Sequence, residues 1–365
     1  MRTLLLLSVS MLCASAARTQ CNGLTESCLR PYDEVAYLTT HNAFNVGSEG
    51  YAFPNQNNAI DQQLTDGVRG FMLDVYDFFG TPTLYHGSIV LGSEPLSNAL
   101  NSFKSFLDNN PNEVVTIILE CYVSANDIED EINGAGLDGY LYTKDPFANW
   151  STLQEMIDAN TRLVIFSDVD DASASQEWYH YMWDHATETH FSVGDPNDFT
   201  NEFNRGDSLN DLFIFNHFVT DPILGIGQEA ASTIVNDSLF LMTRIVNNYQ
   251  ETEKFPNFVT LDFYELGDGK AIVDHLNGGH LDVKELQSDW LSIFPNPAED
   301  YILVRSPIYP TEIKVLDMKG KTVIDGIVLT SETDKINLSE LNSGIYYLQV
   351  QHADHSNHIR KLIVQ

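Results

Sequence analysis

The chain has 365 residues, of which 43% are hydrophobic and 11% aromatic, and this length allows one large globular domain and a smaller one. Its 19 basic and 52 acidic side chains give a formal net charge of −33, which repels nucleic acid and anionic membrane surfaces. The charge therefore argues against a nucleic-acid-binding protein and favours solubility and the local capture of divalent cations.

Residues 1–16 have the pattern of a secretory signal peptide. Arg2 precedes an apolar run over residues 4–12, and Ala14-Ser15-Ala16 supplies a small-residue cleavage site. This run is too short to cross a bilayer, and we find no later stretch that is long and apolar enough to do so. We expect an exported protein without a transmembrane segment.

Three cysteines lie beyond this segment, and an exported chain allows them to be oxidised. Cys21 and Cys28 are expected to form a disulfide that closes a small loop. Cys121 ends an apolar run, where a free thiol usually behaves as a small buried hydrophobe.

Between about residues 33 and 265, short apolar runs alternate with longer amphipathic stretches. Runs rich in β-branched and aromatic residues suit strands that are covered on both faces. The alternation of strand and helix predicts an α/β protein, and we expect a TIM-barrel-like architecture. The runs cover residues 35–40, 68–73, 83–85, 114–119, 163–166, 212–215 and 258–261.

Polar or ionisable residues follow nearly every one of these predicted strands. In a barrel, the carboxyl ends of the strands meet at one mouth, so these side chains are expected to converge there. Packing alone does not explain such a pattern, and it predicts an active mouth. The residues are His41, Asn42, Asp74, His86, Glu120, Ser167, Asp168, Asn216, His217 and Asp262.

Two of these residues, His41 and His86, form a candidate acid–base pair for a phosphate ester. The unperturbed pKa of imidazole lies near 6.5, so both protonation states are accessible at neutral pH. We expect His41 to be the base and His86 the acid. Oxygen atoms of Asn42, Asp74 and Glu120 form a candidate site for Ca²⁺ or Mg²⁺, although either acid also has the alternative role of orienting a histidine or pairing with Arg69.

Other residues have less specific interpretations. One role for Arg69 is to neutralise phosphate charge, but it points to the opposite side of its strand from Asp74, so we expect instead a structural salt bridge or cap at the bottom of the barrel. Asp262 and His217 are expected to line the pocket and bind substrate. His180, His185 and His190 are spaced by five residues, which does not fit a helical zinc pair, and are expected at the surface or rim.

The final segment, residues 290–365, has short alternating runs separated by turn signals such as Lys319-Gly320 and Ser343-Gly344. This pattern predicts a small all-β, immunoglobulin-like sandwich. The expected strands cover residues 301–304, 312–316, 322–324, 345–350 and 359–364.

The ordered motifs over residues 21–265 resemble the X domain of phosphatidylinositol-specific phospholipase C, above all as it occurs in secreted plant and fungal proteins. The resemblance rests on Cys21-Asn22-Gly23, Leu38-Thr39-Thr40-His41-Asn42, Met72-Leu73-Asp74, His86, residues 114–120, Asn216-His217-Phe218 and residues 259–264. The tail is similar to the type A sorting domain of the type IX secretion system in Bacteroidetes, through Phe294-Pro295-Asn296-Pro297, residues 316–321, residues 341–346 and Lys361-Leu362-Ile363-Val364.

The resemblance implies a secreted phosphoric diester hydrolase of the phospholipase C type. His41 would activate the inositol 2-hydroxyl for attack on phosphorus, and His86 would protonate the departing diacylglycerol oxygen. Asn42, Asp74 and Glu120 fall on the ligand positions of the calcium-dependent branch. That branch has a glutamate two residues before the aspartate, and Met72 stands there in this chain, which weakens the calcium site.

We therefore expect a signal peptide over residues 1–16, a phosphodiesterase barrel over 21–285 and a sorting domain over 290–365 that engages the type IX machinery. The expected substrate is a phospholipid or a glycerophosphodiester. Two alternatives stay open: a glycerophosphodiesterase or sphingomyelinase-D-like activity, and a secreted surface-binding protein that has lost turnover. An ordinary accessory sandwich is the alternative for the tail.

Overall fold

The computed structural model describes residues 20–171, 174–221, 226–278, 292–305, 312–327, 333–351 and 357–365. The predicted signal peptide lies outside the described residues. The barrel region and the C-terminal strands have separate hydrophobic cores.

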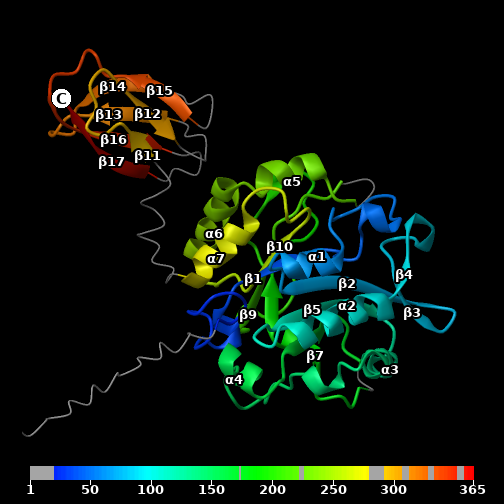
Figure 1. The fold of residues 1–365 in the computed structure, drawn as a ribbon. Helices are drawn as coiled ribbons and strands as arrows, with labels where there is room; N and C mark the ends of the chain where they lie inside the picture. The colour runs from blue at the N-terminus through cyan, green and yellow to red at the C-terminus, as the bar shows by residue number, and fades with distance from the viewer. Residues whose placement is uncertain are drawn as a thin grey trace, which may run out of the picture.

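The barrel region is built on parallel strands in the spatial order β7-β6-β5-β2-β1-β10-β9-β8 (Figure 1). Because all these strands run the same way, their carboxyl ends lie at one edge, as the sequence pattern predicted. The strands are β1 (Tyr37–Thr40), β2 (Gly70–Phe78), β5 (Val115–Tyr122), β6 (Leu163–Ser167), β7 (Tyr179–Tyr181), β8 (Ala186–Glu188), β9 (Leu212–Asn216) and β10 (Phe258–Leu261).

Helices connect the strands and cover the outside of the sheet (Figure 1). The predicted apolar face of residues 96–107 lies on α2, whose Leu96, Phe103 and Leu107 are buried. Capping boxes begin α3 at Ser124 and α4 at Thr152, since each side chain accepts a bond from the third helical N–H. The helices are α1 (Ile60–Thr65), α2 (Leu96–Asn109), α3 (Ala125–Ala135), α4 (Leu153–Asp158), α5 (Glu229–Val235), α6 (Ser238–Thr252) and α7 (Gly269–Gly278).

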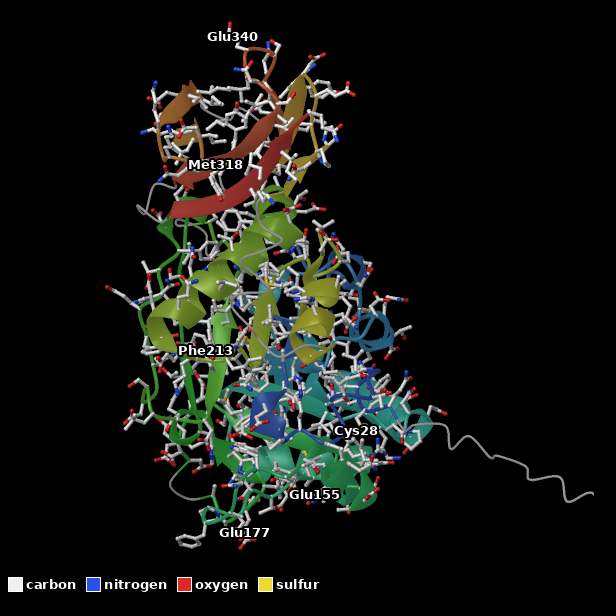
Figure 2. All side chains as sticks on the ribbon, turned by 90° about the vertical axis from the view of Figure 1, so that its left-hand side faces the viewer. Cys28, Glu155, Glu177, Phe213, Met318 and Glu340 are labelled. Carbon is white, nitrogen blue, oxygen red and sulfur yellow. A yellow bond between two sulfur atoms is a disulfide. The ribbon has the colours of Figure 1, made fainter. Side chains whose placement is uncertain are left out.

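Side chains alternate between two hydrophobic cores along each strand, which fixes the side that each residue faces. Tyr37, Phe166 and Ile214 belong to a cluster inside the barrel, together with Trp150 from the loop before α4. Their neighbours along the strands pack instead with helix residues such as Phe103 and Leu241. Figure 2 shows Phe213 within this packed interior and the exposed Glu177 at its periphery.

Two strands of the barrel were not predicted from the sequence, and one predicted strand belongs to a hairpin instead of the parallel barrel. β7 and β8 were not predicted, because each has only three residues and neither forms a long apolar run. Within the described residues no ladder joins β7 to β8, so the barrel is open between them. The predicted run at 83–85 is β3 (Thr81–Leu84), which forms an antiparallel hairpin with β2 and pairs with β4 (Glu94–Pro95).

Three expectations about individual residues are confirmed in the barrel region. Cys21 and Cys28 form a disulfide, and Cys121 is a buried free thiol. Arg69 makes an ion pair with Glu113, with an Nε–Oε2 distance of 2.8 Å, next to the amino-terminal end of β5. The guanidinium therefore lies at the end of the strands opposite the mouth.

The expectation that all three histidines after residue 178 lie at the surface is wrong for His180. Its side chain is buried on β7 and its Nε2 lies 3.1 Å from the Tyr142 carbonyl oxygen. His185 is half-buried, and His190 is exposed. The reason is the unpredicted strand β7, which turns His180 into the barrel.

The C-terminal strands form two antiparallel sheets, in the orders β11-β12-β15 and β14-β13-β16-β17. One hydrophobic core joins Ile302 and Ile336 of the first sheet to Val315 and Leu348 of the second, as in a small sandwich. The strands are β11 (Ser292–Phe294), β12 (Tyr301–Arg305), β13 (Glu312–Leu316), β14 (Thr322–Ile327), β15 (Thr333–Asn337), β16 (Gly344–Gln351) and β17 (Asn357–Val364); β11 and β15 were not predicted.

Across the described residues, no helix combines the length and the hydrophobicity that a membrane span requires.

Candidate active site

A cavity of about 100 Å³ lies at the carboxyl ends of the barrel strands. Its wall combines an apolar part with carboxylates, one histidine and one guanidinium, so it suits a ligand that is partly polar. The lining residues are His41, Met72, Asp74, Ile118, Leu119, Glu120, Asp168, Trp183, Glu188, Phe191, Arg205, Ile214, Asn216 and Phe218.

The alternation of side chains along the strands explains why these residues meet. Met72, Ile118 and Phe166 belong to or pack on the core inside the barrel. Asp74, Glu120 and Asp168 each follow one of these residues by two positions and so face the same side of the sheet. Asp74 and Glu120 are also direct partners in the parallel register of β2 and β5. The predicted convergence of Asp74 and Glu120 at the mouth is thus present in the structure.

His41 follows β1 and is held on two sides. Its Nδ1 lies 2.9 Å from Oδ1 of Asp262, which follows β10 and is fully buried. Its ring stacks on Phe218, with centroids 4.0 Å apart and planes 8° apart. With Nδ1 bound by the carboxylate, Nε2 is the ring nitrogen that can accept a proton, and the side chain keeps 20% of its surface accessible.

His86 follows β3 and is brought to the same site by the hairpin. Its Nδ1 lies 3.0 Å from Oδ2 of Asp74, and its side chain is 34% exposed. Gly87 follows with a φ of 65°, a left-handed conformation that suits glycine at this turn. Asn42 Nδ2 lies 3.3 Å from the same His86 nitrogen, so the residue after one histidine contacts the other.

Asn55 is a site residue that the sequence analysis missed. It comes from the loop before α1, which has no strand-end signal, and it is 1% exposed. Its Nδ2 donates to Oδ2 of Asp262 at 3.0 Å, and its Oδ1 accepts from Nδ2 of Asn42 at 3.2 Å. An asparagine in a polar loop carries no sequence signal of such contacts.

The acidic groups of the cavity have perturbed ionisation. Glu120 is an exposed residue, yet its carboxyl group lines the cavity, where burial and the neighbouring charge of Asp74 raise its pKa above the usual range. The Tyr122 hydroxyl donates to Glu120 Oε1 at 2.6 Å and opposes this shift in pKa. Burial also raises the pKa of Asp168, against the effect of the Cys121 N–H, which donates to its Oδ1.

Arg205 was also missed, because it lies in a loop between β8 and β9. Its Nε and Nη2 donate to the two carboxylate oxygens of Glu188 at 2.5 and 3.2 Å, and its Nη1 lies 3.6 Å from Oδ2 of Asp168. The guanidinium also lies over the rings of Trp183 and Phe191, 4.3 and 4.9 Å from their centroids. This residue links the ends of β6 and β8 across the open part of the barrel.

The predicted substrate contacts of Asp262 and His217 are corrected by the structure. Both are fully buried, and neither lines the cavity. Asp262 holds His41 instead. His217 lies at an outward-facing position after β9, where its Nε2 is 2.7 Å from the Val235 carbonyl oxygen and its Nδ1 accepts from Arg244 at 3.0 Å. Burial and the charge of Arg244 hold the pKa of His217 well below its usual range.

The candidate cation ligands Asn42, Asp74 and Glu120 all offer side-chain oxygen atoms. Asn42 Oδ1 is buried without a hydrogen-bond partner, and Asp74 and Glu120 are adjacent carboxylates. Three side chains with hard oxygen donors fit a divalent cation. Met72 contributes no oxygen, and among the described residues no group of three His, Cys, Asp or Glu side chains forms a metal site. Water or substrate oxygens would have to complete the coordination.

The fold and the site define a class: a parallel α/β barrel with two histidine–carboxylate pairs at its mouth. The family model PI-PLC X 1 matches residues 27–277, and the chain belongs to this family. Residues 292–365 match the secretion system C-terminal sorting domain.

Two of three similar proteins carry the same family description. A PI-PLC X domain-containing protein of Arabidopsis thaliana is 32% identical over 68% of this chain and 63% of its own length. PI-PLC X domain-containing protein 1 of Arthroderma benhamiae is 26% identical over 71% of this chain and 89% of its own. An uncharacterized secreted protein of the same fungus is 27% identical over 68% and 61%. This chain thus spans less than two thirds of two of these relatives.

Among solved structures, a mutant of the phosphatidylinositol-specific phospholipase C from Staphylococcus aureus aligns with a TM-score of 0.48 and 12% identity. The alignment covers 71% of this chain and 96% of that enzyme.

Proposed function

We propose that the barrel is an exported phosphoric diester hydrolase of the phospholipase C type. The observation that carries this proposal is the pair of histidine–carboxylate contacts, His41 with Asp262 and His86 with Asp74. In each pair the carboxylate accepts from Nδ1, which orients the ring and leaves Nε2 toward the site. With two histidines at one mouth, one can take a proton from the attacking hydroxyl while the other gives a proton to the leaving oxygen.

In the proposed reaction, His41 takes the proton of a head-group hydroxyl next to the phosphate. The hydroxyl oxygen bonds to phosphorus as the bond between phosphorus and the leaving oxygen breaks. His86 gives its proton to that departing alkoxide, which leaves as an alcohol, and a cyclic phosphodiester forms. The second half runs in reverse with water, so each histidine exchanges its role.

We propose Asn42, Asp74 and Glu120 as the residues that hold a divalent cation, with Ca²⁺ as the candidate. A bound cation would neutralise charge on the phosphate oxygens. The support is the unpartnered Asn42 oxygen together with the two adjacent carboxylates. Since the described site offers three protein ligands, we expect weak binding of the cation. A chelator should remove the cation and so abolish turnover.

The proposed substrate is a phospholipid or a glycerophosphodiester with a polyol head group. The net charge of −33 opposes unaided docking on an anionic lipid surface. We therefore expect soluble or zwitterionic diesters to be turned over at least as well as anionic vesicles. A glycerophosphodiesterase or a sphingomyelinase-D-like activity is the alternative within the same class of enzyme.

The test is a panel of phosphodiesters assayed with Ca²⁺ and with chelator, with the products followed by phosphorus NMR. A cyclic phosphate as first product supports the proposal, and a linear phosphomonoester from the start contradicts the cyclising route. His41→Ala and His86→Ala should each abolish turnover, while His190→Ala, which changes an exposed histidine, should not. Full activity in both site variants would exclude the acid–base pair.

A second candidate, a secreted binding protein without turnover, is favoured by Met72 alone. This residue lines the cavity where a carboxylate would strengthen a cation site. If the wild type turns over no diester with or without Ca²⁺ but binds glycerophosphodiesters by calorimetry, this candidate replaces the hydrolase.

We also propose that the sorting domain directs the chain through the type IX secretion machinery after the signal peptide has taken it across the inner membrane. The support is the match of residues 292–365 to a secretion-system sorting domain. Removal of residues 292–365 should leave the protein inside the cell envelope, as checked by fractionation and immunoblotting.

A further inference from the structure

Asn55 lies between the two histidine–carboxylate pairs: it contacts Asp262 of one pair and Asn42, which lies against His86 of the other pair. Its Nδ2 donates to Oδ2 of Asp262, whose other oxygen holds His41. Its Oδ1 accepts from Nδ2 of Asn42, and that same nitrogen lies 3.3 Å from Nδ1 of His86. A chain of hydrogen bonds therefore runs from His41 through Asp262 and Asn55 to Asn42, whose Nδ2 lies against Nδ1 of His86.

The direction of this chain follows from Asp262. A carboxylate only accepts, so Asn55 must turn its NH₂ group toward Asp262. Its Oδ1 then faces the other way and requires donors, which Asn42 and Asn45 supply with their NH₂ groups at 3.2 and 2.6 Å. As a result, Asn42 Oδ1 cannot point at Asn55, and this oxygen is the buried acceptor without a partner.

Neighbouring residues fix Asn55 in place. Its own N–H donates to the Asn45 carbonyl oxygen at 2.9 Å, and its carbonyl oxygen accepts from the N–H of Phe263 at 2.8 Å. The next residue, Gln56, donates from Nε2 to the carbonyl oxygens of His41 and Leu261. The loop before α1 is thus attached to the ends of both β1 and β10.

Space around the chain is equally restricted. A Cβ added to Gly227 would lie 2.7 Å from Oδ2 of Asp262 and 2.9 Å from Nδ2 of Asn55. These distances are too short for non-bonded atoms, so an alanine there would push the two groups apart. Gly227 therefore offers an independent way to disturb the contact between Asn55 and Asp262 without changing either residue.

We propose that Asn55 is a positioning residue that couples the two histidine–carboxylate pairs and sets the orientation of the Asn42 amide. It touches neither the cavity nor a reacting atom and acts through Asp262 and Asn42. The kinetic consequence rests on the proposed function, whereas the structural coupling does not. The experiment therefore needs a structural readout and a kinetic readout.

The structural readout is the nitrogen-15 NMR spectrum of histidine-labelled protein at one neutral pH, which reports which ring nitrogen carries the proton. His41→Ala and His86→Ala assign the two signals by their loss. We expect Asn55→Ala and Gly227→Ala to move both signals, although neither residue contacts either ring. The control is Asn277→Ala, which removes a buried asparagine that bonds the backbone of Ala36, before the other end of β1.

The Asn277→Ala control should lower Tm and leave both histidine signals in place. The kinetic readout uses the phosphodiester that the wild type turns over: in Asn55→Ala, kcat should fall by about tenfold to a hundredfold while KM stays within about threefold. Asn55→Leu, which keeps a branched side chain but has no polar atom, should show the same split if Asn55→Ala fails to fold.

Two results would overturn the inference. One is an Asn55 variant that folds and shifts only the His41 signal or neither signal, and the other is an equal shift of both signals in Asn277→Ala. If no phosphodiester is turned over at all, the proposed function fails, and the NMR result still decides whether Asn55 couples the two pairs.

Discussion

The replacement Asp262→Asn tests the orientation of His41 most directly. Asp262 is fully buried and accepts two hydrogen bonds, from His41 Nδ1 at 2.9 Å and from Asn55 Nδ2 at 3.0 Å. An asparagine offers one acceptor and one donor in the same space. Whichever way the new amide turns, it cannot keep both the hydrogen bond from His41 and the hydrogen bond from Asn55.

If the new amide turns its NH₂ toward His41, the ring must accept at Nδ1, so its proton moves to Nε2 and the base is lost. If it turns its oxygen toward His41, two NH₂ groups face each other at Asn55. A hydrogen bond to a buried charged group is worth about 3 kcal/mol, which corresponds to about 150-fold in rate. The wrong tautomer in the Ser-His-Asp triad costs about 10⁴-fold, so we expect a loss of kcat/KM of about 10²- to 10⁴-fold.

The assay is the initial rate of phosphodiester turnover followed by phosphorus NMR, with circular dichroism to establish that the variant folds. Asp130→Asn, the same replacement at a position on the surface helix α3 that is not part of the site, is the matched control and should retain wild-type activity. A folded Asp262→Asn enzyme within about threefold of the wild type would refute the reasoning that the carboxylate sets the tautomer of His41.

Three further predictions concern stability. Arg69→Met removes the guanidinium that bonds Glu113 and two backbone carbonyl oxygens, and should lower the free energy of unfolding by about 2–4 kcal/mol in urea with little effect at the mouth. Burial lowers the pKa of His180 to about 4, so its contribution to stability is present above its unfolded pKa of about 6.5 and is lost as pH falls toward 4; urea titrations should show a loss of roughly 3 kcal/mol that is absent in His180→Gln. The pKa of Glu120 is raised, so its stabilising contribution is present at acid pH and is lost as pH rises through the folded pKa; Glu120→Gln should therefore raise Tm at pH 7 and not at pH 4.

Each of these has an outcome that contradicts it. An Arg69→Met protein as stable as the wild type would show that the backbone carbonyls find other donors. An acid loss of stability that persists in His180→Gln would assign the effect to other groups. A Glu120→Gln protein whose Tm falls at pH 7 would mean that the carboxylate is stabilised rather than strained at the mouth.

The strand-end pattern was sufficient to predict the convergence of the main site residues, for a physical reason. Parallel strands bring their carboxyl ends together, and the period of two decides which residues face inward. His41, Asp74 and Glu120 follow directly from these two facts. The same parity places His217 outward, since Ile214 belongs to the inner core and Phe215 to the outer one. The prediction for His217 was wrong because it considered only that the residue follows a strand. It did not consider which face of the sheet the side chain occupies.

Other features had no signal of this kind. β7 and β8 are each three residues long, too short for a periodic pattern, so His180 and Glu188 were not assigned to the barrel. Asn55 and Arg205 lie in loops, and each contacts residues far away in the chain: Asn55 bonds Asp262 across 207 positions. Long-range contacts of loop residues depend on how the whole barrel closes.

The sequence by itself determined that an α/β barrel presents two histidines and several acids at one mouth, because residue type and a two-residue period are local properties. Only the tertiary structure decided which acid holds which histidine, that Asp262 is a buried partner rather than a substrate ligand, and that Asn55 joins the two pairs. These are choices among hydrogen-bond partners, and they depend on distances of about 3 Å between atoms that lie far apart in the chain.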